Sequence, residues 1–571
     1  MRIPLLLALA LAACGSAWAG TPPDPALSAL SRDFFAWRVG TCPSTGDDLT
    51  RVERPVAWVP DWSPRSIEER RTRTAQFASR LAALDHTGWT LADSVDWLLL
   101  HSAISRVHYE LDVLRSAARN PDFYTQQTLG PVFELLLQPP PFSTERAAGI
   151  VHRLESIPTT LSYARKNIRD GVGVFADIAL SDLDGIGARL DAFRHALTPL
   201  LPRESAARFN EAVKKAASAL EGYRTWLTQQ RSSMKGTFVI GRSNYDWFLT
   251  NIALMPYSSA DVVAIGKGEW ERSVAFDEYE SLRNAGHPPP AMFPSAEAQI
   301  AAEARDEDAI RAFLVERGIL DVPPWIGHYR NQKLPPYLVP LQGLGVTDDL
   351  TSPSRPGENA TSYILDPSPT LSFFRKSTAQ DPRPIIVHEG VPGHFFQYAL
   401  SWSHPDSIRR HYFDSGSCEG IGFYAEEMML QMGLFDDKPG TRETIYRFMR
   451  LRALRVEVDV KLATGEFSIA EGARYLAATV PMDNETASGE AAFFATNPGQ
   501  AISYQIGKAQ IIRMIADAKI RQGERFILRD LHNFLWLNGF VPVALQRWEY
   551  LGARDEVDRI LRNLSLHNSA H

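Results

Sequence analysis

The chain has 571 residues, of which 44% are hydrophobic, and a formal net charge of -7. Its length allows a large buried core and exceeds that of one compact domain of ordinary size. Because nucleic-acid binding depends on clustered positive charge and no run rich in lysine and arginine is present, we expect no nucleic-acid partner.

The N-terminus predicts export from the cytoplasm. Arg2 precedes an apolar stretch, residues 3–11, that is too short to span a bilayer comfortably. The small-x-small sequence that ends at Ala19 fits ordinary signal peptidase, which would make residues 1–19 a signal peptide.

A lipoprotein signal competes with this site. The sequence Leu-Ala-Ala-Cys that ends at Cys14 resembles the bacterial lipobox, which would remove residues 1–13 and lipidate the cysteine. We favour it slightly, because the apolar stretch ends directly at Cys14. The protein would then be periplasmic and anchored to the outer membrane. Cys42 and Cys418 remain in the mature chain and either form a disulfide or stay free.

Helical periodicity dominates the first half of the mature chain. Apolar spacing and composition predict long helices over residues 66–84, from residue 91 onward and over 205–230. The cap signal Ser258-Ser259 predicts another from 261 to about 284. Proline triplets at 139–141 and 288–290 should end the helices that precede them.

Residues 322–381 are rich in proline and are the expected place for a small sheet. The best strand candidate is Thr361–Leu365, bounded by glycine and asparagine before it and proline after it. We expect it to be an edge strand along the active-site cleft, where it could hold an extended peptide and where Tyr363 is a substrate-binding candidate. From residue 385 the pattern returns to helix.

The sequence His388-Glu389 with a second histidine, His394, is typical of zinc peptidases. The usual motif, His-Glu-x-x-His, places both imidazoles on one helical face. Here the second histidine follows six residues after the first, so on a regular helix the two would point about 120° apart and lie about 9 Å apart along the axis. We expect Pro392 and Gly393 to introduce a kink or bulge that lets both bind one ion. The alternative is that one histidine is a structural core residue.

Acidic residues downstream strengthen the metal hypothesis. Glu419 lies 25 residues after His394 and would complete a His₂Glu site with one open position. Glu426, two turns further on the same helical face, could orient a ligand histidine by a hydrogen bond or replace Glu419 as ligand. We expect its neighbour Glu427 to face solvent.

Three motifs in this order resemble the bacterial family catalogued as domain of unknown function 885. They are His388-Glu389-x-x-Pro392-Gly393-His394-x-x-Gln397, Glu419-Gly420-x-x-x-Tyr424-x-Glu426, and Pro498-Gly499-Gln500-Ala501-x-x-Tyr504-x-x-Gly507. Weaker likeness, as in Tyr245-Asp246-Trp247-Phe248, extends over most of the mature chain. The sequence departs from the family at Ile421 and Gly422, where Trp-Ala is usual.

The family is grouped with the zinc-peptidase clan of thimet oligopeptidase, angiotensin-converting enzyme and carboxypeptidase Taq. The resemblance implies a mainly α, two-lobed fold with a deep cleft and a small sheet near the active site. We expect a helical N-terminal lobe over residues 20–330 and a catalytic lobe over 331–571. Tyr504 is the expected oxyanion donor, because related enzymes use a tyrosine from a late helix, although it could equally be a buried structural aromatic.

We therefore expect an exported zinc metallopeptidase that hydrolyses short peptides as an oligopeptidase, dipeptidase or carboxypeptidase. Bound Zn²⁺ would lower the pKa of its water, and Glu389 would accept the proton. Gln397 is a candidate for orienting a ligand, and Gln500 and His532 are substrate-binding candidates. Lys508 and Arg513 could anchor a substrate carboxylate, but we expect both to be surface cations.

Two alternatives stay open at this point. The same site could hydrolyse an amide in cell-wall fragments, because the metal centre would be common to both reactions. The protein could instead be a non-catalytic binding lipoprotein with a structural zinc. Glu389 argues against the second alternative, since a structural site needs no adjacent base.

Overall fold

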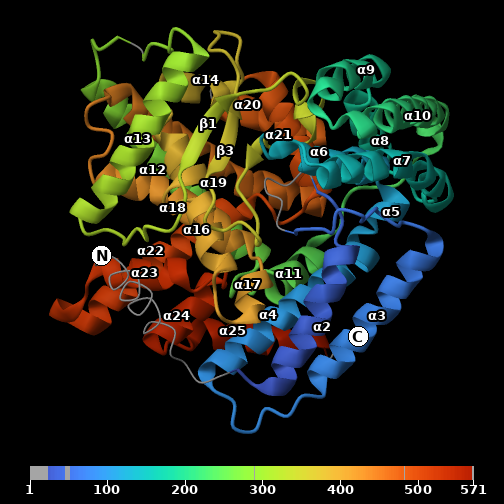
Figure 1. The fold of residues 1–571 in the computed structure, drawn as a ribbon. Coiled ribbons are helices and arrows are strands. Elements are labelled where there is room, and N and C mark those ends of the chain that lie inside the picture. The colour runs from blue at the N-terminus through green and yellow to red at the C-terminus, as the bar shows by residue number, and fades with distance from the viewer. Residues whose placement is uncertain (1–22, 46–51, 289, 481, 569–571) are drawn as a thin grey trace, which may run out of the picture.

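The computed structural model describes residues 23–45, 52–288, 290–480 and 482–568 and consists mainly of α-helices around one small sheet (Figure 1). Both predicted signal sequences, including Cys14, lie outside the described residues. In these four ranges, no helix is both long enough and apolar enough to cross a bilayer.

The helices before residue 320 include those that apolar spacing and the cap signal at Ser258 predicted. Ser63 caps the first long helix by accepting from the backbone N–H of Ser66, and Thr90 and Ser258 each form a capping box at the start of theirs. The helices are α2 (Pro25–Thr41), α3 (Pro64–Ala82), α4 (Leu91–His108), the π-helix η1 (Tyr109–Leu114), α5 (Ser116–Arg119), α6 (Pro121–Leu137), α7 (Thr144–Asn167), α8 (Gly173–Asp182), α9 (Ile186–Leu197), α10 (Arg203–Gln230), α11 (Arg242–Asn251), α12 (Ser259–Arg283) and α13 (Ala296–Glu316). Helices α6 and α12 end before the two proline triplets, as predicted.

Helices also fill the chain after residue 372. They are α14 (Phe373–Gln380), α15 (Arg383–Ile385), the π-helix η5 (Ile386–Gly390), α16 (His394–Trp402), α17 (Ser407–His411), α18 (Ser415–Gln431), α19 (Pro439–Thr464), α20 (Ile469–Thr479), α21 (Asn484–Thr496), α22 (Ile502–Gln522), α23 (Leu528–Leu537), α24 (Val543–Leu551) and α25 (Asp555–Asn568). Short 3₁₀ segments are η2 (Thr198–Leu200), η3 (Arg231–Ser233), η4 (Val339–Leu344) and η6 (Gly523–Arg525).

The sheet lies in the proline-rich segment, where it was predicted. Its strands are β1 (Tyr329–Lys333), β2 (Asp348–Asp349) and β3 (Ala360–Ile364), in the order β1-β3-β2. β3 pairs in parallel with β1 and antiparallel with β2. The expected strand therefore exists, but its assignment as an edge strand was wrong. Its local sequence pattern carries no information about which segments pair with it on either side.

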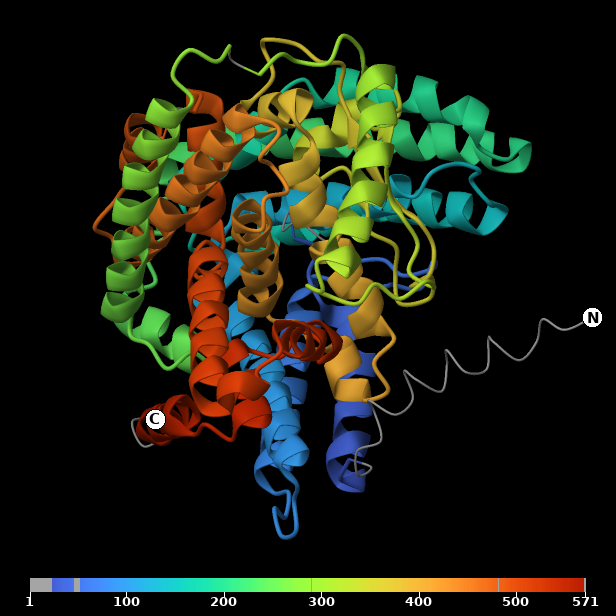
Figure 2. The same cartoon turned by 90° about the vertical axis from the view of Figure 1, so that its left-hand side faces the viewer.

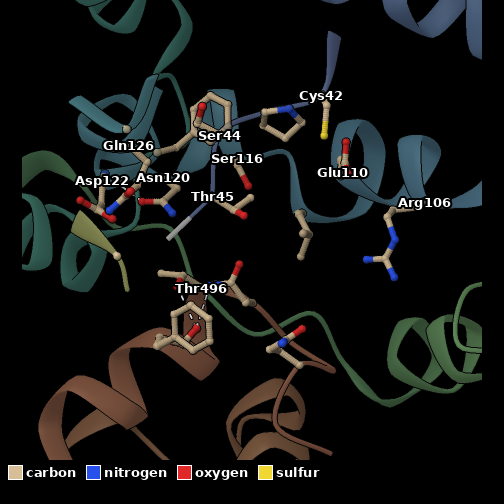
Figure 3. Close-up of a pocket in the computed structure, with 18 of the residues that line it drawn as sticks. Cys42, Ser44, Thr45, Arg106, Glu110, Ser116, Asn120, Asp122, Gln126 and Thr496 are labelled. Carbon is tan, nitrogen blue, oxygen red and sulfur yellow. Dashed lines mark hydrogen bonds between the residues drawn. The ribbon is translucent and has the colours of Figure 1, made fainter. Parts of the chain in front are cut away.

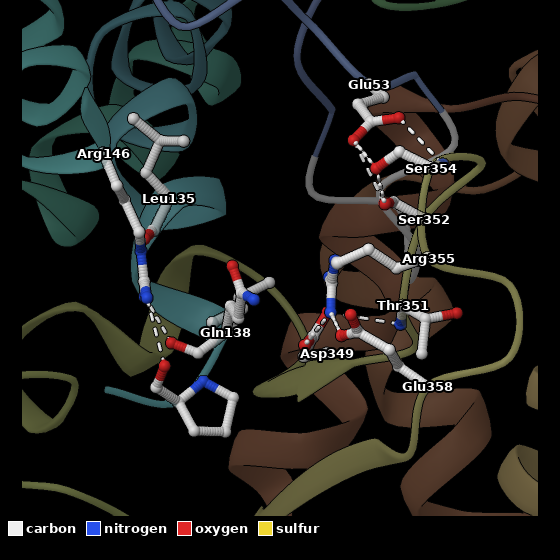
Figure 4. A network of polar contacts seen from close by, with 12 residues as sticks. Glu53, Leu135, Gln138, Arg146, Asp349, Thr351, Ser352, Ser354, Arg355 and Glu358 are labelled. Carbon is white, nitrogen blue, oxygen red and sulfur yellow. Dashed lines mark hydrogen bonds and ion pairs between the residues drawn. The ribbon is translucent and has the colours of Figure 1, made fainter. Parts of the chain in front are cut away.

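Polar contacts fix the connections around the sheet (Figure 4). Arg355 donates to both carboxylate oxygens of Asp349 in β2, at 2.9 and 3.3 Å. Arg146 of α7 donates to backbone carbonyls that follow α6, including that of Pro139 at 3.1 Å. These contacts satisfy polar groups at places where regular hydrogen-bond ladders end.

Helices from distant parts of the sequence pack directly against one another. α12 lies beside α19, and both are seen at the left of Figure 2, in green and orange. α18 packs closely on α22, where a Cβ on Gly420 would lie 2.7 Å from the Cα of Gly507. The predicted division into two lobes at residue 330 remains a prediction. α12 belongs to the predicted N-terminal lobe and α19 to the predicted catalytic lobe, and the two helices pack against each other. The α18–α22 contact places two of the predicted motifs next to each other.

Candidate metal centre

The helix that begins the first motif is interrupted between the two histidines. The π-helix η5 ends at Gly390, Val391 is extended (φ -127°, ψ 123°), and α16 starts at His394. A side chain on Gly393 would overlap the backbone carbonyl of His388. The structure thus contains the predicted interruption, and it depends on a residue without a Cβ at position 393.

This interruption brings the two imidazoles together. Their ring centroids are 4.7 Å apart with an interplanar angle of 81°. The Nε2 atoms of His388 and His394 lie 3.4 and 3.3 Å from the same oxygen, Oε2 of Glu419. Each of the three residues offers a ligand atom, all of these atoms lie within 4.8 Å of one another, and all three side chains are buried.

The geometry fits a tetrahedral zinc ion. Zinc bonds of about 2.0–2.1 Å at tetrahedral angles place neighbouring ligand atoms about 3.3 Å apart. The two distances from Glu419 to the imidazole nitrogens have this length. Two imidazoles and a carboxylate also form a common ligand set of catalytic zinc sites, which leaves the fourth position open.

Helix α18 supplies the acidic residues. Its N-terminus is capped by Asp414, whose carboxylate accepts from the backbone N–H of Ser417 at 2.7 Å. Residues 416–430 of this helix are buried without interruption. Gly422 faces His388, because a Cβ at this position would lie 2.9 Å from the Cε1 atom of that imidazole. α18 therefore approaches the histidines closely enough for Glu419 to reach them.

Glu426 holds His388 from the other side of the ring. Its Oε1 atom lies 2.7 Å from Nδ1 of His388, and its two oxygens accept from Arg452 of α19 at 2.8 and 3.1 Å. All three side chains are buried. This arrangement fixes the ring so that Nε2 points toward Glu419, and it makes Glu419, and not Glu426, the carboxylate shared by both histidines.

A thiol contacts the second histidine. Sγ of Cys418 lies 3.2 Å from Nδ1 of His394 and 4.0 Å from the hydroxyl of Tyr398. Cys418 and Cys42 are both free thiols in the structure, so the disulfide alternative is not realised. The sequence placed Cys418 directly before Glu419, yet it gave no sign that the thiol would lie against His394.

Glu427 and Lys508 correct two predictions of surface exposure. Glu427 is 8% exposed, and Lys508 is fully buried. The Lys508 ammonium lies 2.5 Å from Glu269 and 2.8 Å from Glu427, and Arg272 pairs with Glu427 at 2.6 Å. The exposure prediction was wrong because α22 packs on α18 and the α12 side chains Glu269 and Arg272 close this cluster. Arg513, with a side chain 44% exposed and ion pairs to Asp555 and Glu556, is a surface cation.

The remaining catalytic candidates border the same site. Oε2 of Glu389 lies 4.0 Å from Nε2 of His394, and the Glu389 side chain is 17% exposed, which leaves it within reach of water. The ring of Tyr504 stacks on His388 with a centroid distance of 6.1 Å. Arg455 lies over the ring of Tyr504, with its guanidinium carbon 4.8 Å from the ring centroid. The same guanidinium forms an ion pair with Glu490 at 2.6 Å.

Electrostatics couple the histidines to the carboxylates. Burial by itself lowers the pKa of His388, but its contacts with Glu419 and Glu426 outweigh this effect and raise the pKa to about 9. Burial raises the pKa of Glu419, yet the charge of His394 and the contacts with both imidazoles hold it well below its ordinary value. The carboxylate is thus ionised, and His388 carries a proton at neutral pH when no cation replaces it.

The other predicted site residues lie in different environments. Tyr363 donates its hydroxyl to the carbonyl of Leu137 at 3.0 Å. Both ring nitrogens of His532 have partners, the hydroxyl of Tyr424 at 2.9 Å and the carbonyl of Ile319 at 2.8 Å. Tyr363 and His532 thus use their polar atoms within the protein.

Gln397 and Gln500, the two glutamines predicted for the site, also differ in their surroundings. Gln397 is fully buried, and neither atom of its amide has a hydrogen-bond partner among the described residues. Gln500 accepts from Ser415 at 3.1 Å and lines a large cavity. Of the substrate-binding candidates, only Gln500 thus lies at an open space beside the centre.

That cavity has a volume of about 1710 Å³ and lies between the N-terminal helices and α21 (Figure 3). Tyr398 and Gln500 belong to its lining. The three candidate ligands do not line it, but Tyr398 approaches Cys418, which contacts His394. The cavity is therefore separated from the metal centre by a thin layer of side chains.

A second group of potential metal ligands consists of Glu307, Asp308 and His328. Unlike the first group, its carboxylates are already paired with arginines. Arg311 pairs with Glu307 at 2.6 Å, and Arg330 pairs with Asp308 at 2.9 Å. These arginines already neutralise both carboxylates, so this group carries no metal hypothesis.

Comparisons with known proteins identify the fold but no activity. The family model described as "Bacterial protein of unknown function (DUF885)" matches residues 50–548. One similar solved structure is a "putative lipoprotein of unknown function" from Shewanella oneidensis, with a TM-score of 0.66 and 15% identity over 92% of this chain and 99% of that chain. Another is a "putative lipoprotein" from Colwellia psychrerythraea, with a TM-score of 0.70 and 15% identity over 95% of this chain and 98% of that chain. None of the curated proteins matches the chain. At 15% identity the structural likeness shows a shared fold alone.

Proposed function

The chain belongs to the bacterial family of unknown function DUF885, and we propose that it is a zinc-dependent metallopeptidase that hydrolyses short peptides outside the cytoplasm. The observation that carries this proposal is the convergence of His388, His394 and Glu419 at tetrahedral ligand spacing, with Glu389 directly beside them.

The three ligand residues are held rigidly, which favours a site built for one ion. Glu426 and Arg452 orient His388, Cys418 contacts His394, and Glu419 lies in the buried part of α18, residues 416–430. When bound there, zinc would polarise a substrate carbonyl and acidify a water molecule. A purely structural site would gain nothing from an open fourth position or from a neighbouring base.

Glu389 is the proposed general base. Its carboxylate is partly accessible, unlike that of Glu419, and it lies at the edge of the ligand group near His394. It can therefore take a proton from the attacking water and deliver it to the leaving amine. Tyr504 stands beside His388, where its hydroxyl could donate to the oxyanion of the tetrahedral intermediate.

The size and burial of the site favour short peptides. The three candidate ligands are buried, so a folded protein could not bring a peptide bond to them. A two-lobed, zinc-peptidase-like arrangement and a periplasmic or lipid-anchored location are part of this proposal. The proposed location is supported by the lipobox-like sequence that ends at Cys14 and by the two similar structures, which are described as putative lipoproteins.

A first experiment combines metal analysis with product mass spectrometry. We expect about one zinc per chain after purification without chelators and cleavage of a mixed library of short peptides. Glu389→Gln should retain zinc and lose at least about 100-fold in kcat. Full activity of this variant would exclude the proposed base. Hydrolysis of muropeptides alone would instead favour a cell-wall amidase, and zinc without any hydrolysis would favour a structural metal site.

A further inference from the structure

Three buried polar residues of α19 contact the surroundings of the candidate metal centre. Arg452, Arg455 and Asp459 are separated by three and four residues, so they lie on one side of the helix. Arg452 holds Glu426, which in turn contacts His388. The other two residues contact α22 or the residues directly before it, and α19 packs on α22. α19 therefore supports the surroundings of the centre at more than one point.

The ring of Tyr504 is bordered by two guanidinium groups of α19. The guanidinium carbon of Arg455 lies 4.8 Å from the ring centroid, and that of Arg452 lies 5.5 Å from it. The ring also stacks on the imidazole of His388, with an interplanar angle of 18°. A guanidinium at such a distance is attracted by the face of an aromatic ring. Tyr504 is therefore in contact with a candidate metal ligand and with the two arginines that α19 supplies.

Glu490 of α21 fixes the guanidinium of Arg455. The two carboxylate oxygens of Glu490 accept from Nε and Nη2 of Arg455, each at 2.6 Å. This two-point contact sets the plane of the guanidinium as well as its position. The ring centroids of Phe494 in α21 and Phe374 in α14 lie 5.7 and 5.8 Å from the same guanidinium carbon. The side chain of Arg455 thus has little freedom to move away from Tyr504.

Asp459 fixes the backbone directly before α22. Its carboxylate accepts from the backbone N–H of Gly499 at 2.9 and 3.1 Å and from that of Ala501 at 2.9 Å. Both donors belong to the third sequence motif, and α22 begins with the residue that follows them. Asp459 therefore determines where the backbone of α22 starts, whereas Arg455 contacts the ring of Tyr504 itself.

We propose that Arg455 is a positioning residue that holds the phenol of Tyr504 in place for the reaction. This inference rests on the proposed peptidase function, in which the Tyr504 hydroxyl donates to the oxyanion. Such a donor is effective only when it lies about 2.7–3.1 Å from the oxyanion. The side chain of a tyrosine turns about two torsions, and the packing of the guanidinium on the ring restricts both. Arg455 would thus act on the reaction through Tyr504.

The test combines Arg455→Gln with Tyr504→Phe, alone and together, on a short peptide that the wild-type protein cleaves. Loss of the Tyr504 hydroxyl should lower kcat by about 100- to 1000-fold. We expect Arg455→Gln to lower kcat by about 10- to 100-fold, with KM and zinc content unchanged, because the donor is misplaced and the metal site is not. In protein that already lacks the hydroxyl, the change at Arg455 should alter kcat by less than about twofold.

Two further variants separate positioning from stability. Arg450→Gln is the matched control, since Arg450 lies on the same helix, about 140° around it from Arg455, and pairs with Asp277 at 2.9 Å. It should keep the wild-type kcat. Arg455→Lys keeps a cation beside Glu490 but loses the planar contact with the ring, so it should fold and still lose at least about tenfold in kcat. Equal losses in the Arg450 and Arg455 variants, or losses that multiply when Tyr504→Phe is added, would overturn the proposal.

Crystal structures of the wild-type and Arg455→Lys proteins separate this inference from the peptidase proposal. In the variant we expect the ring of Tyr504 to be displaced, while the three candidate metal ligands keep their positions. An unmoved ring would overturn the positioning role and leave the peptidase proposal intact. A wild-type protein that binds zinc but cleaves no peptide would overturn the peptidase proposal, and a displaced ring would still show that Arg455 holds Tyr504.

Discussion

Nδ1 of His388 lies 2.7 Å from Oε1 of Glu426, and the same carboxylate pairs with the buried guanidinium of Arg452. The contact fixes which ring nitrogen of His388 faces the proposed ion. It also links three helical segments, η5, α18 and α19, at one point. The position of the imidazole thus depends on a carboxylate that does not itself belong to the ligand group.

Replacing Glu426 tests this dependence. Glu426→Gln should lower zinc affinity by about 10- to 100-fold, because the ring of His388 loses its charged partner. It should also destabilise the protein by about 3 kcal/mol, since Arg452 stays buried without a counter-charge. The double variant Glu426→Gln/Arg452→Met should recover much of the stability but not the affinity. Chelator competition and denaturant unfolding measure the two effects separately.

Cys418, which contacts His394, should affect zinc affinity less than Glu426 does. We expect Cys418→Ala to lower zinc affinity by up to about tenfold, because Nδ1 of His394 loses its neighbour at 3.2 Å. Cys418→Ser, which keeps a hydrogen-bonding atom there, should stay closer to wild type. Cys42→Ala serves as the control and should leave affinity unchanged. Equal affinities of all three variants would show that the thiol contact has no positioning role.

The interruption between the histidines should tolerate no side chain at position 393. Gly393→Ala should displace the start of α16, because the new Cβ overlaps the carbonyl of His388. Since a shift of about 1 Å can cost about 100-fold in rate, we expect at least that loss in kcat/KM. Gly268→Ala is the control: it lies in α12 with nothing within 4 Å of the added Cβ, and it should stabilise the protein by about 0.5–1 kcal/mol.

Zinc affinity should rise with pH. The pKa of His388 is raised to about 9 in the metal-free protein, so the cation must displace a proton from this imidazole at any lower pH. Affinity should therefore increase by about tenfold per pH unit between pH 6 and 8 from this group alone. Competition with a chelator of known pH dependence measures the slope, and a flat profile would contradict the assignment.

The raised pKa of His388 also makes the stability of the metal-free protein fall as the pH rises. Protonated His388 stabilises the metal-free fold fully below the unfolded pKa of about 6.5, and this contribution is lost as pH rises through about 9. Zinc replaces the proton, so the gain in Tm on adding zinc should grow between pH 6.5 and 9. Thermal unfolding with and without zinc tests this difference.

The buried ion cluster at Lys508 is structural and separable from catalysis. Lys508→Met leaves Glu269 and Glu427 without their shared cation, so it should destabilise the protein by about 3–5 kcal/mol. Lys214→Met removes an exposed partner of Glu211 instead and should change stability by less than about 1 kcal/mol. Similar stabilities of the two variants in urea would show that the cluster contributes little.

The sequence alone identified several helices, because their start signals are local. Ser258, for example, caps α12 by accepting from the backbone N–H of Asp261, only three residues away. It also indicated His388, Glu389, His394 and Glu419, since zinc ligands belong to a few residue types with characteristic spacing. The need for an interruption followed from helix geometry, as six residues cannot return to one face.

Only the tertiary structure decided what surrounds these residues. Arg452 reaches Glu426 from a helix that carries no recognisable motif, and β3 becomes a central strand because of segments distant in sequence. Burial of Glu427 and Lys508 likewise depends on α22, which packs on α18, and on the side chains of Glu269 and Arg272 that α12 places beside them. Such contacts arise from long-range packing, so no local pattern of charge or hydrophobicity encodes them. The candidate ligands were therefore predictable from sequence, whereas the residues that hold them in place were not.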